Sequence, residues 1–574
     1  MFLRMTVVRR IAISLVATFV LFSGAHAQFL DAVLGIVAPV APGRYPVGCS
    51  NVEQDFTRVP PGSSAQAFWE GRGGDADGYI TDLLLDPAHA FVAGVTLPGD
   101  SELYGDFNGH TLPSVNLVCY PTSPANGYAD YLLPNGKLVP HMQRGADPPI
   151  FAADRARFPM LLFSHGFGGS PISSDYIEAL KLFASHGYVV IAPFHGDSRI
   201  VDVRIDSLDD LLQAILDFRN YTAMQAIRPH ALSAAIDVVL ANPDFAARID
   251  AARIGGFGAS QGGESLLLMR GAQLTVSVGL SSKSVMNDPR LRAVVGYVPY
   301  FGQPFFPAFG RDQSGLQGVD LPYLAISGSI DLTAPAAVTS LGMTQLAGVR
   351  QFVLLEGVSH GFDVASSDDI FTWSLTFLGA YVQDDPLLRA TSARMTKVAG
   401  GGDDVLLLDR AEPLPPGPGE RLAIEYYNPS LDHYFMTAEP AEAAMLDQGL
   451  LVPGWYRTGY EFKVYARDAP AGLPACRFVG TPGIGPTSHF FTILANECAL
   501  VRNDPYWKFE DFAFRVDAPD GIGACPADRV PVIRMYNNGK GGQANHRYLT
   551  SHSEIGGMLL AGWIVEGPVF CSLA

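Results

Sequence analysis

Residues 255–265 read GGFGASQGGES and place Ser260 among five glycines. It begins within the apolar run ARIGGF, at 252–257, and continues into the helix-like run GGESLLLMRG, at 262–271. Its centre, residues 258–262, matches the pattern G-x-S-x-G, in which a serine occupies a sharp strand-to-helix turn and only glycine fits on either side. We therefore predict that Ser260 is a nucleophile, exposed at the carboxyl edge of a sheet and at a helix N-terminus, whose dipole favours a developing anion.

Apolar runs typical of buried strands recur along the chain from residue 158 onward. They are PMLLFSHG, YVVIAPFHGD, ARIGGFGAS, LRAVVGYVP, PYLAISGSID and QFVLLEGVSHG, with helical patterns such as DYIEALKLFASHG between them. Runs without polar alternation are typical of a parallel sheet that helices cover on both faces. The sequence thus predicts the α/β class, with a doubly wound, mostly parallel sheet.

Two further residues complete a candidate catalytic triad with Ser260. Serine is a poor nucleophile at neutral pH and needs a base, and the chain order expected with this turn is serine, acid, histidine. Asp331 and His360 follow in that order, each at the end of an apolar strand-like run, at the sheet edge where ligands bind. We expect His360 to accept the serine proton, and Asp331 to fix the imidazole tautomer and stabilise the imidazolium.

Two other acids compete with Asp331 for this role. Asp363 lies three residues beyond His360, and Asp197 ends the run FHGD. The first lacks placement at a strand end and the second precedes the serine. Because triads are recognised by geometry rather than by order, both stay open.

An oxyanion hole requires backbone N–H groups close to the nucleophile. One comes from the residue after the serine, Gln261, and the second from the loop after an early strand, here SHGFGG. In that loop Phe167 is the expected donor. We expect His165 to structure the loop through hydrogen bonds rather than to act directly. The loss of one such donor costs about 3–4 kcal/mol of transition-state stabilisation.

The motifs SHGFGG, GASQGG, SGSID and GVSHGFD together resemble those of the α/β-hydrolases. Within that superfamily they are most similar to the group of dienelactone hydrolases, platelet-activating-factor acetylhydrolases and cutinase-like polyester hydrolases, over residues 44–395. The resemblance implies a lipase-like serine esterase that hydrolyses small, lipid or polymeric carboxylic esters without a cofactor or metal. A serine peptidase on the same fold, and a binding or adhesion protein on a degenerate hydrolase scaffold, are the alternatives.

An aromatic stretch, GYVPYFGQPFFPAFG, follows the strand-like run LRAVV. Its side chains allow two interpretations. They could form a pocket for the acyl or aryl part of a substrate, or they could be core packing beneath a loop.

The chain of 574 residues is long enough for two or three domains. Its first 27 residues combine three arginines, the apolar run IAISLVATFVLF and the cleavage pattern Ala25-His26-Ala27. They predict a signal peptide, whose apolar run is too short to span a membrane, and hence a secreted or periplasmic protein without a transmembrane anchor. We expect the catalytic domain at 28–395, with an N-terminal extension, and a linker rich in glycine and proline at 396–421.

The remaining residues, 422–574, contain a threefold repeat. The segments DHYFMT, SHFFT and NHRYLT recur at a nearly constant spacing, and a tryptophan follows each of them. This periodicity predicts a smaller all-β domain with pseudo-threefold symmetry, in which the recurring aromatic and tryptophan positions build a shared core. It resembles a poorly characterised module of secreted bacterial proteins. The functional alternative is a surface that binds a polymer or glycan.

Six cysteines form an N-terminal pair and a C-terminal group of four. In an oxidising compartment an even number favours disulfides, and we expect Cys49–Cys119. For the other four cysteines, Cys476–Cys498 with Cys525–Cys571 is preferred among three possible pairings. The net charge of −18 shows no basic surface of the kind that nucleic-acid binding needs.

Overall fold

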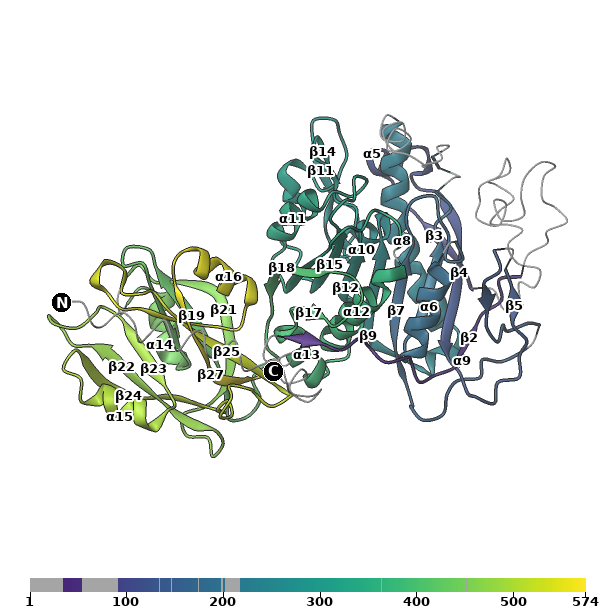
Figure 1. Ribbon diagram of the computed structural model, residues 1–574. Helices are drawn as coiled ribbons and strands as arrows, with labels where there is room; N and C mark the ends of the chain where they lie inside the picture. Colours follow the sequence, from purple (N-terminus) through teal and green to yellow (C-terminus); the bar gives the residue numbers. More distant parts are fainter. Residues whose placement is uncertain are drawn as a thin grey trace.

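The computed structural model describes residues 35–53, 91–133, 135–145, 147–173, 175–197, 200–201, 217–362, 364–450 and 453–574. The predicted signal peptide and the competing acid Asp363 lie outside these residues. Figure 1 shows two bodies side by side, one built on a large sheet with helices and one, towards the C-terminus, formed mainly by strands.

A ten-stranded sheet, order β18-β16-β15-β12-β9-β7-β8-β4-β2 with β3 beside β4, organises the first body. The six strands from β16 to β8 pair in parallel, whereas the strands at both edges are antiparallel. The predicted mostly parallel sheet is confirmed. Its strands are β2 (Val47–Cys49), β3 (Phe91–Thr96), β4 (Thr111–Pro121), β7 (Phe158–Ser164), β8 (Val189–Phe194), β9 (Ile249–Ala259), β12 (Leu291–Tyr297), β15 (Tyr323–Gly328), β16 (Arg350–Leu355) and β18 (Asp404–Arg410).

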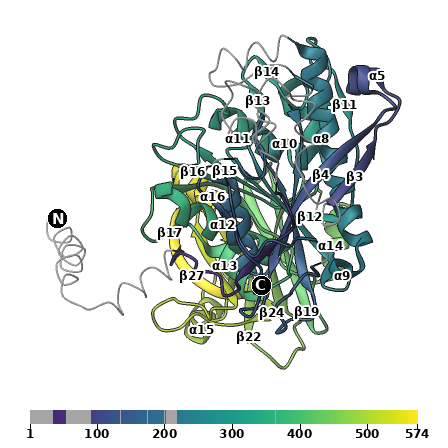
Figure 2. The same cartoon turned by 90° about the vertical axis from the view of Figure 1, so that its right-hand side faces the viewer.

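Helices cover both faces of this sheet (Figures 1 and 2). One buried apolar cluster contains side chains of α8 (Phe218–Ala241), α10 (Gln261–Met269) and α11 (Ala336–Gln345). A second contains side chains of α6 (Tyr176–Ser185) and α12 (Ser367–Tyr381). Strands β7, β8 and β15 are buried at every position, which explains their continuous apolar sequences.

Shorter elements complete the first body. They are β1 (Ile36–Val37) with β17 (Lys397–Val398), the hairpins β5 (Tyr131–Leu132) with β6 (Leu138–Val139), β10 (Gln273–Thr275) with β11 (Ser282–Ser284) and β13 (Gly302–Gln303) with β14 (Phe306–Pro307), and the helices α5 (Ser101–Tyr104), α9 (Pro243–Ala246) and α13 (Pro386–Arg394). Among the described residues, no helix combines the length and apolar character that a membrane crossing requires.

The segment expected to be a linker, 396–421, contributes to the sheet. Its strand β18 pairs with β16, and the Asp404 carboxylate accepts hydrogen bonds from the indole of Trp373 (2.7 Å) and the backbone of Val398 (3.0 Å). The segments before and after β18 are rich in glycine and proline, and they predicted a linker. The apolar run DVLLL between them is too short to indicate a strand by itself. The ordered α/β body therefore extends to residue 410.

Three consecutive units build the C-terminal body, each of two strands, a helix and a third strand. The units are β19 (Glu420–Asn428), β20 (His433–Thr437), α14 (Pro440–Asp447), β21 (Tyr456–Tyr465); β22 (Leu473–Gly480), β23 (His489–Thr492), α15 (Ala495–Arg502), β24 (Trp507–Val516); and β25 (Arg529–Tyr536), β26 (His546–Leu549), α16 (His552–Leu560), β27 (Ile564–Leu573). The antiparallel, threefold arrangement is confirmed. The three helices were not predicted, because eight or nine residues carry too little periodic signal.

The three repeats share a core, although the tryptophans take no central part in it. Phe435, Phe491 and Tyr548, which follow the three recurring histidines, are buried in one cluster. Trp507 and Trp563 instead pack in separate peripheral clusters, and Trp455 only borders the shared core. The recurring aromatic positions therefore build the core as predicted, whereas the prediction for the tryptophans is wrong for two of the three.

Ion pairs link each repeat to the next. Glu442 of the first repeat pairs with Arg477 of the second (2.8 Å), and Glu497 of the second pairs with Arg534 of the third (3.0 Å). Arg547 of the third pairs with Glu425 of the first (2.9 Å). Charged contacts thus close the ring of repeats across each boundary, and Lys540 with Asp432 (2.8 Å) adds a second pair between the third repeat and the first.

All six cysteines form disulfides, and the three predicted pairings are confirmed. Cys49 and Cys119 lie opposite each other on β2 and β4. In the C-terminal body Cys476 joins Cys498, and Cys525 joins Cys571.

Replacing Cys49 and Cys119 by serine is expected to lower the free energy of unfolding by about 4 kcal/mol, because their bond closes a loop of 70 residues in the unfolded chain. Urea denaturation of the full chain measures this. The double replacement of Cys476 and Cys498, whose separation is 22 residues, is the comparison and should cost less. Equal stability of the Cys49/Cys119 variant and the wild type would contradict the expectation.

Candidate active site

Ser260 occupies the turn between β9 and α10 in a strained backbone conformation. Its φ is 53° and its ψ −121°, a region that L-residues rarely adopt and that clusters at functional sites. A Cβ at Gly258 would collide with the backbone of Gly262, and one at Gly262 would collide with the carbonyl of Ser164 on β7. The two glycines are therefore required sterically, and they allow the turn to close against the neighbouring strand.

The structure brings Ser260, His360 and Asp331 together in one hydrogen-bonded chain. His360 follows β16 and Asp331 follows β15, so both come from the carboxyl edge of the sheet, as predicted. The Ser260 Oγ lies 2.9 Å from His360 Nε2, and His360 Nδ1 lies 2.8 Å from Asp331 Oδ2. Asp331 is buried, whereas the His360 side chain is 28% exposed, so the imidazole borders solvent and a substrate can reach it.

The surroundings of Asp331 fix how its carboxylate faces the histidine. Oδ1 accepts hydrogen bonds from the backbone N–H groups of Thr333 and Ala334, both at 2.8 Å. Oδ2 remains free to accept a hydrogen bond from the N–H at His360 Nδ1. That tautomer leaves a lone pair on Nε2, which is the atom that faces the hydroxyl of Ser260.

The predicted oxyanion donors lie on either side of Ser260. Gln261 is the first residue of α10, where helix geometry leaves the N–H without an intrahelical acceptor. Phe167 lies in the loop after β7. That loop abuts the nucleophile, since a Cβ at Gly166 would lie 3.4 Å from the Cβ of Ser260. Within the described part of the chain, the N–H groups of Phe167 and Gln261 have no hydrogen-bond acceptor.

His165 structures this loop, as the sequence suggested. Its Nε2 accepts the backbone N–H of His195 (3.2 Å), so its proton is on Nδ1, which donates to the Gly166 carbonyl (2.7 Å). Burial lowers the pKa of His165 to about 4, which keeps the ring neutral at physiological pH. The competing acid Asp197 forms a buried ion pair with Arg228 (3.0 Å), a partner other than the triad histidine.

Most of the aromatic stretch after β12 is core packing, whereas one of its side chains is exposed. Tyr297, Tyr300, Phe301 and Phe309 are buried in the core. Phe305 lies at the tip of the β13–β14 hairpin and is 65% exposed. The Gln303 side chain donates to the carbonyl of Thr333 (2.8 Å), so this hairpin borders the loop that holds Asp331.

A buried polar layer beneath Ser260 was not predicted from the sequence. The amide of Gln225 on α8 donates to Glu264 Oε1 (2.6 Å), and the amide of Gln261 donates to the hydroxyl of Tyr221 (2.7 Å). Burial raises the pKa of Glu264 to about 8, with Arg228 and the Gln225 amide opposing the rise. Glu264 is therefore largely protonated at neutral pH. Nothing in the run GGES distinguishes this carboxyl from a solvent-exposed one in the first turn of a helix.

Glu264→Gln is expected to stabilise the protein at pH 8 and to have much less effect near pH 4.5. An unfolded chain ionises Glu264 near its ordinary pKa of 4.5, whereas the folded chain holds the proton up to about pH 8. Stability is therefore lost progressively between these pH values, by about 1.4 kcal/mol for each unit of pKa difference. The unfolding temperature at both pH values measures this. A constant difference between Glu264→Gln and the wild type across the range would contradict the prediction.

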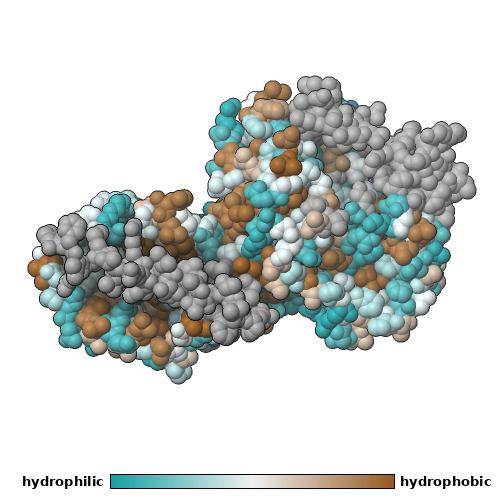
Figure 3. Space-filling view, in the orientation of Figure 1, coloured by the Kyte–Doolittle hydropathy of each residue, from teal (hydrophilic) through white to brown (hydrophobic). Residues whose placement is uncertain are grey.

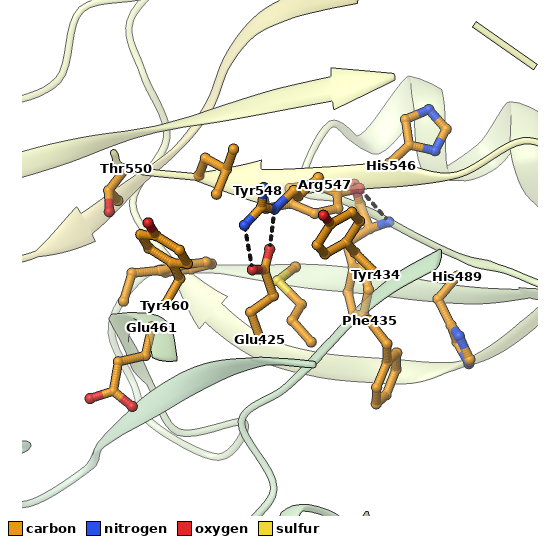
Figure 4. Close-up of a pocket in the computed structure, with 14 residues that line it drawn as sticks. Glu425, Tyr434, Phe435, Tyr460, Glu461, His489, His546, Arg547, Tyr548 and Thr550 are labelled. Carbon is orange, nitrogen blue, oxygen red and sulfur yellow. Dashed lines mark hydrogen bonds and ion pairs between the residues drawn. The ribbon is translucent and has the colours of Figure 1, made fainter. Parts of the chain in front are cut away.

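The C-terminal body contains a small pocket, shown in Figure 4. Its volume is about 10 Å³, room for no more than one water molecule. Glu425 and Arg547 meet there through two hydrogen bonds of 2.9 Å, and the guanidinium lies 4.2 Å from the centre of the Tyr434 ring. This pocket is too small for a sugar ring, and its ion pair joins the third repeat to the first.

No group of three or more His, Cys, Asp or Glu side chains is arranged to hold a metal ion in the ranges that the structure describes. The sequence of residues 422–573 matches the model of a family described as Domain of unknown function (DUF5648). This match covers the C-terminal body. No curated protein is similar enough in sequence to this chain to count as a match.

Proposed function

We propose that this protein is a serine esterase of the α/β-hydrolase type, which cleaves carboxylic esters through an acyl-enzyme. The observation that carries the proposal is the continuous chain from Ser260 Oγ through His360 to Asp331, with the serine on a strained turn. The order of the three residues and their positions at strand ends are those of the resemblance described above. The three disulfides favour an oxidising compartment, in accord with a secreted or periplasmic protein and a cleaved signal peptide.

In the proposed reaction, Ser260 Oγ attacks the ester carbonyl while His360 Nε2 takes the hydroxyl proton. The carbonyl oxygen becomes an oxyanion and accepts hydrogen bonds from the backbone N–H groups of Phe167 and Gln261. Collapse of this intermediate breaks the bond to the alcohol oxygen, which leaves with the proton from His360. Water then attacks the acyl-enzyme by the same route, with His360 again as base, and releases the carboxylic acid and Ser260.

Turnover of p-nitrophenyl acetate and butyrate by the purified full chain tests the proposal. We expect saturable release of p-nitrophenol that survives dialysis against EDTA, because each step uses only side chains and backbone groups of this chain. The matching p-nitroanilides should react far more slowly if the protein is an esterase rather than a peptidase. A rate no higher than that of the heat-denatured protein would contradict the proposal.

We further propose that the C-terminal body adsorbs the enzyme to an insoluble ester polymer. Each repeat exposes a large apolar side chain near the end of its helix: Leu450 (69%), Leu500 (72%) and Leu560 (93%). A second apolar residue beside each tryptophan is also exposed, namely Tyr456, Tyr506 and Ile564. Figure 3 shows hydrophobic side chains gathered on this body near α16. Three such pairs on one domain would raise the local enzyme concentration at a surface.

Replacing Leu450, Leu500 and Leu560 by glutamine in the full chain is expected to weaken adsorption to a polyester film. Turnover of p-nitrophenyl butyrate should stay unchanged, because these residues lie outside the α/β body. The matched control replaces Val92, Leu132 and Leu138, exposed apolar residues of the α/β body, and should adsorb normally. Equal adsorption of all three proteins would refute the role, and retention on cellulose instead of polyester would assign the surface to a glycan.

A further inference from the structure

Arg228 is fully buried beneath the proposed oxyanion hole, at a position on α8 that the reaction described above does not use. Its side chain and that of Asp197 are each 1% exposed. Burying such a pair costs several kcal/mol of desolvation for each ion, so buried pairs seldom contribute net stability. The contacts of this pair indicate another role.

The guanidinium of Arg228 contacts three separate segments. Nε and Nη2 donate to the two carboxylate oxygens of Asp197, both at 3.0 Å. Nη2 also donates to the carbonyl oxygen of Gly166 (3.0 Å), and Nη1 donates to Ser265 Oγ on α10 (3.3 Å). One side chain therefore joins the loop after β7 to the helix that follows the nucleophile.

The bond to Gly166 acts on the proposed oxyanion hole directly. The carbonyl of Gly166 and the N–H of Phe167 belong to the same planar peptide group, so holding the oxygen sets the direction of the N–H on the opposite side. The same oxygen accepts a second hydrogen bond, from the N–H at His165 Nδ1 (2.7 Å). On the far side of Phe167, the N–H of Gly168 donates to Asp197 Oδ2 (2.9 Å). The peptide groups on both sides of Phe167 are thus anchored to this ion pair.

The bond to Ser265 connects the same guanidinium to the first turn of α10, which contains the second donor. Ser265 Oγ donates in turn to the carbonyl of Gln261 (2.7 Å), in the first turn of α10. One rigid, planar group therefore joins the Gly166–Phe167 peptide directly, and the first turn of α10 through Ser265, to the same ion pair. Lysine could not replace it, because its single ammonium cannot reach all three partners.

We propose that Arg228, oriented by Asp197, is a positioning residue that holds the Phe167 N–H at the place where the oxyanion develops. The hydrogen bond from Arg228 to the Gly166 carbonyl also polarises the Gly166–Phe167 peptide, which strengthens its N–H as a donor to that anion. This inference rests on the proposed esterase function.

The test compares Arg228→Lys and the double variant Arg228→Met with Asp197→Asn. The double variant leaves no unpaired buried charge, and the side-chain amide oxygen that replaces the carboxylate at position 197 can still accept the Gly168 N–H. The fraction of intact sites is titrated with a fluorophosphonate, so kcat is expressed for each competent Ser260. We expect kcat to fall 10- to 100-fold in both variants with KM within about twofold, since loss of a whole oxyanion donor costs 10²–10³.

A transition-state analogue separates positioning from general loss of structure. A trifluoromethyl ketone adds to the serine and places its oxyanion in the hole, so its inhibition constant should rise by the same factor as kcat/KM falls. Arg290→Lys is the matched control: Arg290 pairs with Asp288 and Ser233 elsewhere in the same body and should change neither quantity.

The outcomes decide separately for the two proposals. A wild type without ester turnover refutes the proposed function. An active wild type with variants whose kcat per titrated site stays within twofold refutes the role of Arg228. If the double variant fails to fold, Arg228→Lys alone decides, because it retains the buried charge and tests the loss of the fork.

Discussion

Ser260→Ala is expected to lower turnover of p-nitrophenyl butyrate by roughly 10⁴-fold or more while the unfolding temperature stays unchanged. Alanine keeps the Cβ and removes only the hydroxyl that faces His360 Nε2, so the strained turn and both glycine contacts remain. Residual catalysis would come from the oxyanion donors and substrate binding alone. Steady-state kinetics of both proteins give the turnover rates, and thermal unfolding followed by circular dichroism gives the unfolding temperatures.

The control is Ser359→Ala, an exposed serine next to His360 that makes no part of the hydrogen-bonded chain. It should retain the activity of the wild type. Substantial activity in Ser260→Ala, or an equal loss in Ser359→Ala, would mean that another residue is the nucleophile.

Asp331→Asn is expected to lower kcat by roughly 10⁴-fold with little change in KM. Oδ1 is held by the N–H groups of Thr333 and Ala334, so the amide oxygen takes that position and the NH₂ group faces His360. Nδ1 must then accept a hydrogen bond, which moves the imidazole proton to Nε2. The nitrogen that should receive the serine proton is already protonated.

The pH profile distinguishes this tautomer effect from a loss of structure. At high pH, hydroxide can replace the missing base, so the variant should recover activity as the pH rises. Asp368→Asn, an exposed acid near the start of α12, is the control and should behave as the wild type. An unchanged kcat in Asp331→Asn would leave Asp363 as the triad acid.

The sequence predicted the central features of the candidate site because they depend on local patterns. Ser260 requires two flanking glycines, and the structure shows the collisions that any other residue would cause. Asp331 and His360 each follow an apolar strand, and the parallel sheet alone brings the ends of those strands to one edge. The chain order of the three residues and their positions at strand ends were therefore enough to predict that their side chains meet.

The layer beneath the nucleophile could not be predicted in the same way. Gln225 and Arg228 lie in a helix whose sequence, FRNYTAMQAIRPHALSAAIDVVLA, contains polar residues that would ordinarily face solvent. Their burial follows from α8 packing against α10 and the sheet, a tertiary contact with no local signature. For the same reason β18 was not predicted, since this segment forms a strand through its pairing with β16.

The position of β18 also changes how the two bodies can be separated. Asp409 on β18 accepts hydrogen bonds from Ser551, His552 and Ser553 at the start of α16, so the last strand of the sheet caps a helix of the C-terminal body. A chain that ends near residue 400 would lose this strand and, with Asp404, the acceptor of the Trp373 indole N–H. Experiments on the C-terminal body are therefore best made with surface substitutions in the full chain.

Labelling of the full chain with a fluorophosphonate, followed by peptide mapping, tests the central claim most directly. The reagent reacts with a serine only where a base activates it and an oxyanion hole receives the phosphonyl oxygen. We expect one adduct, on Ser260, formed in proportion to the loss of ester turnover and absent from Ser260→Ala. An adduct on a different serine, or ester turnover that persists without any adduct, would contradict it.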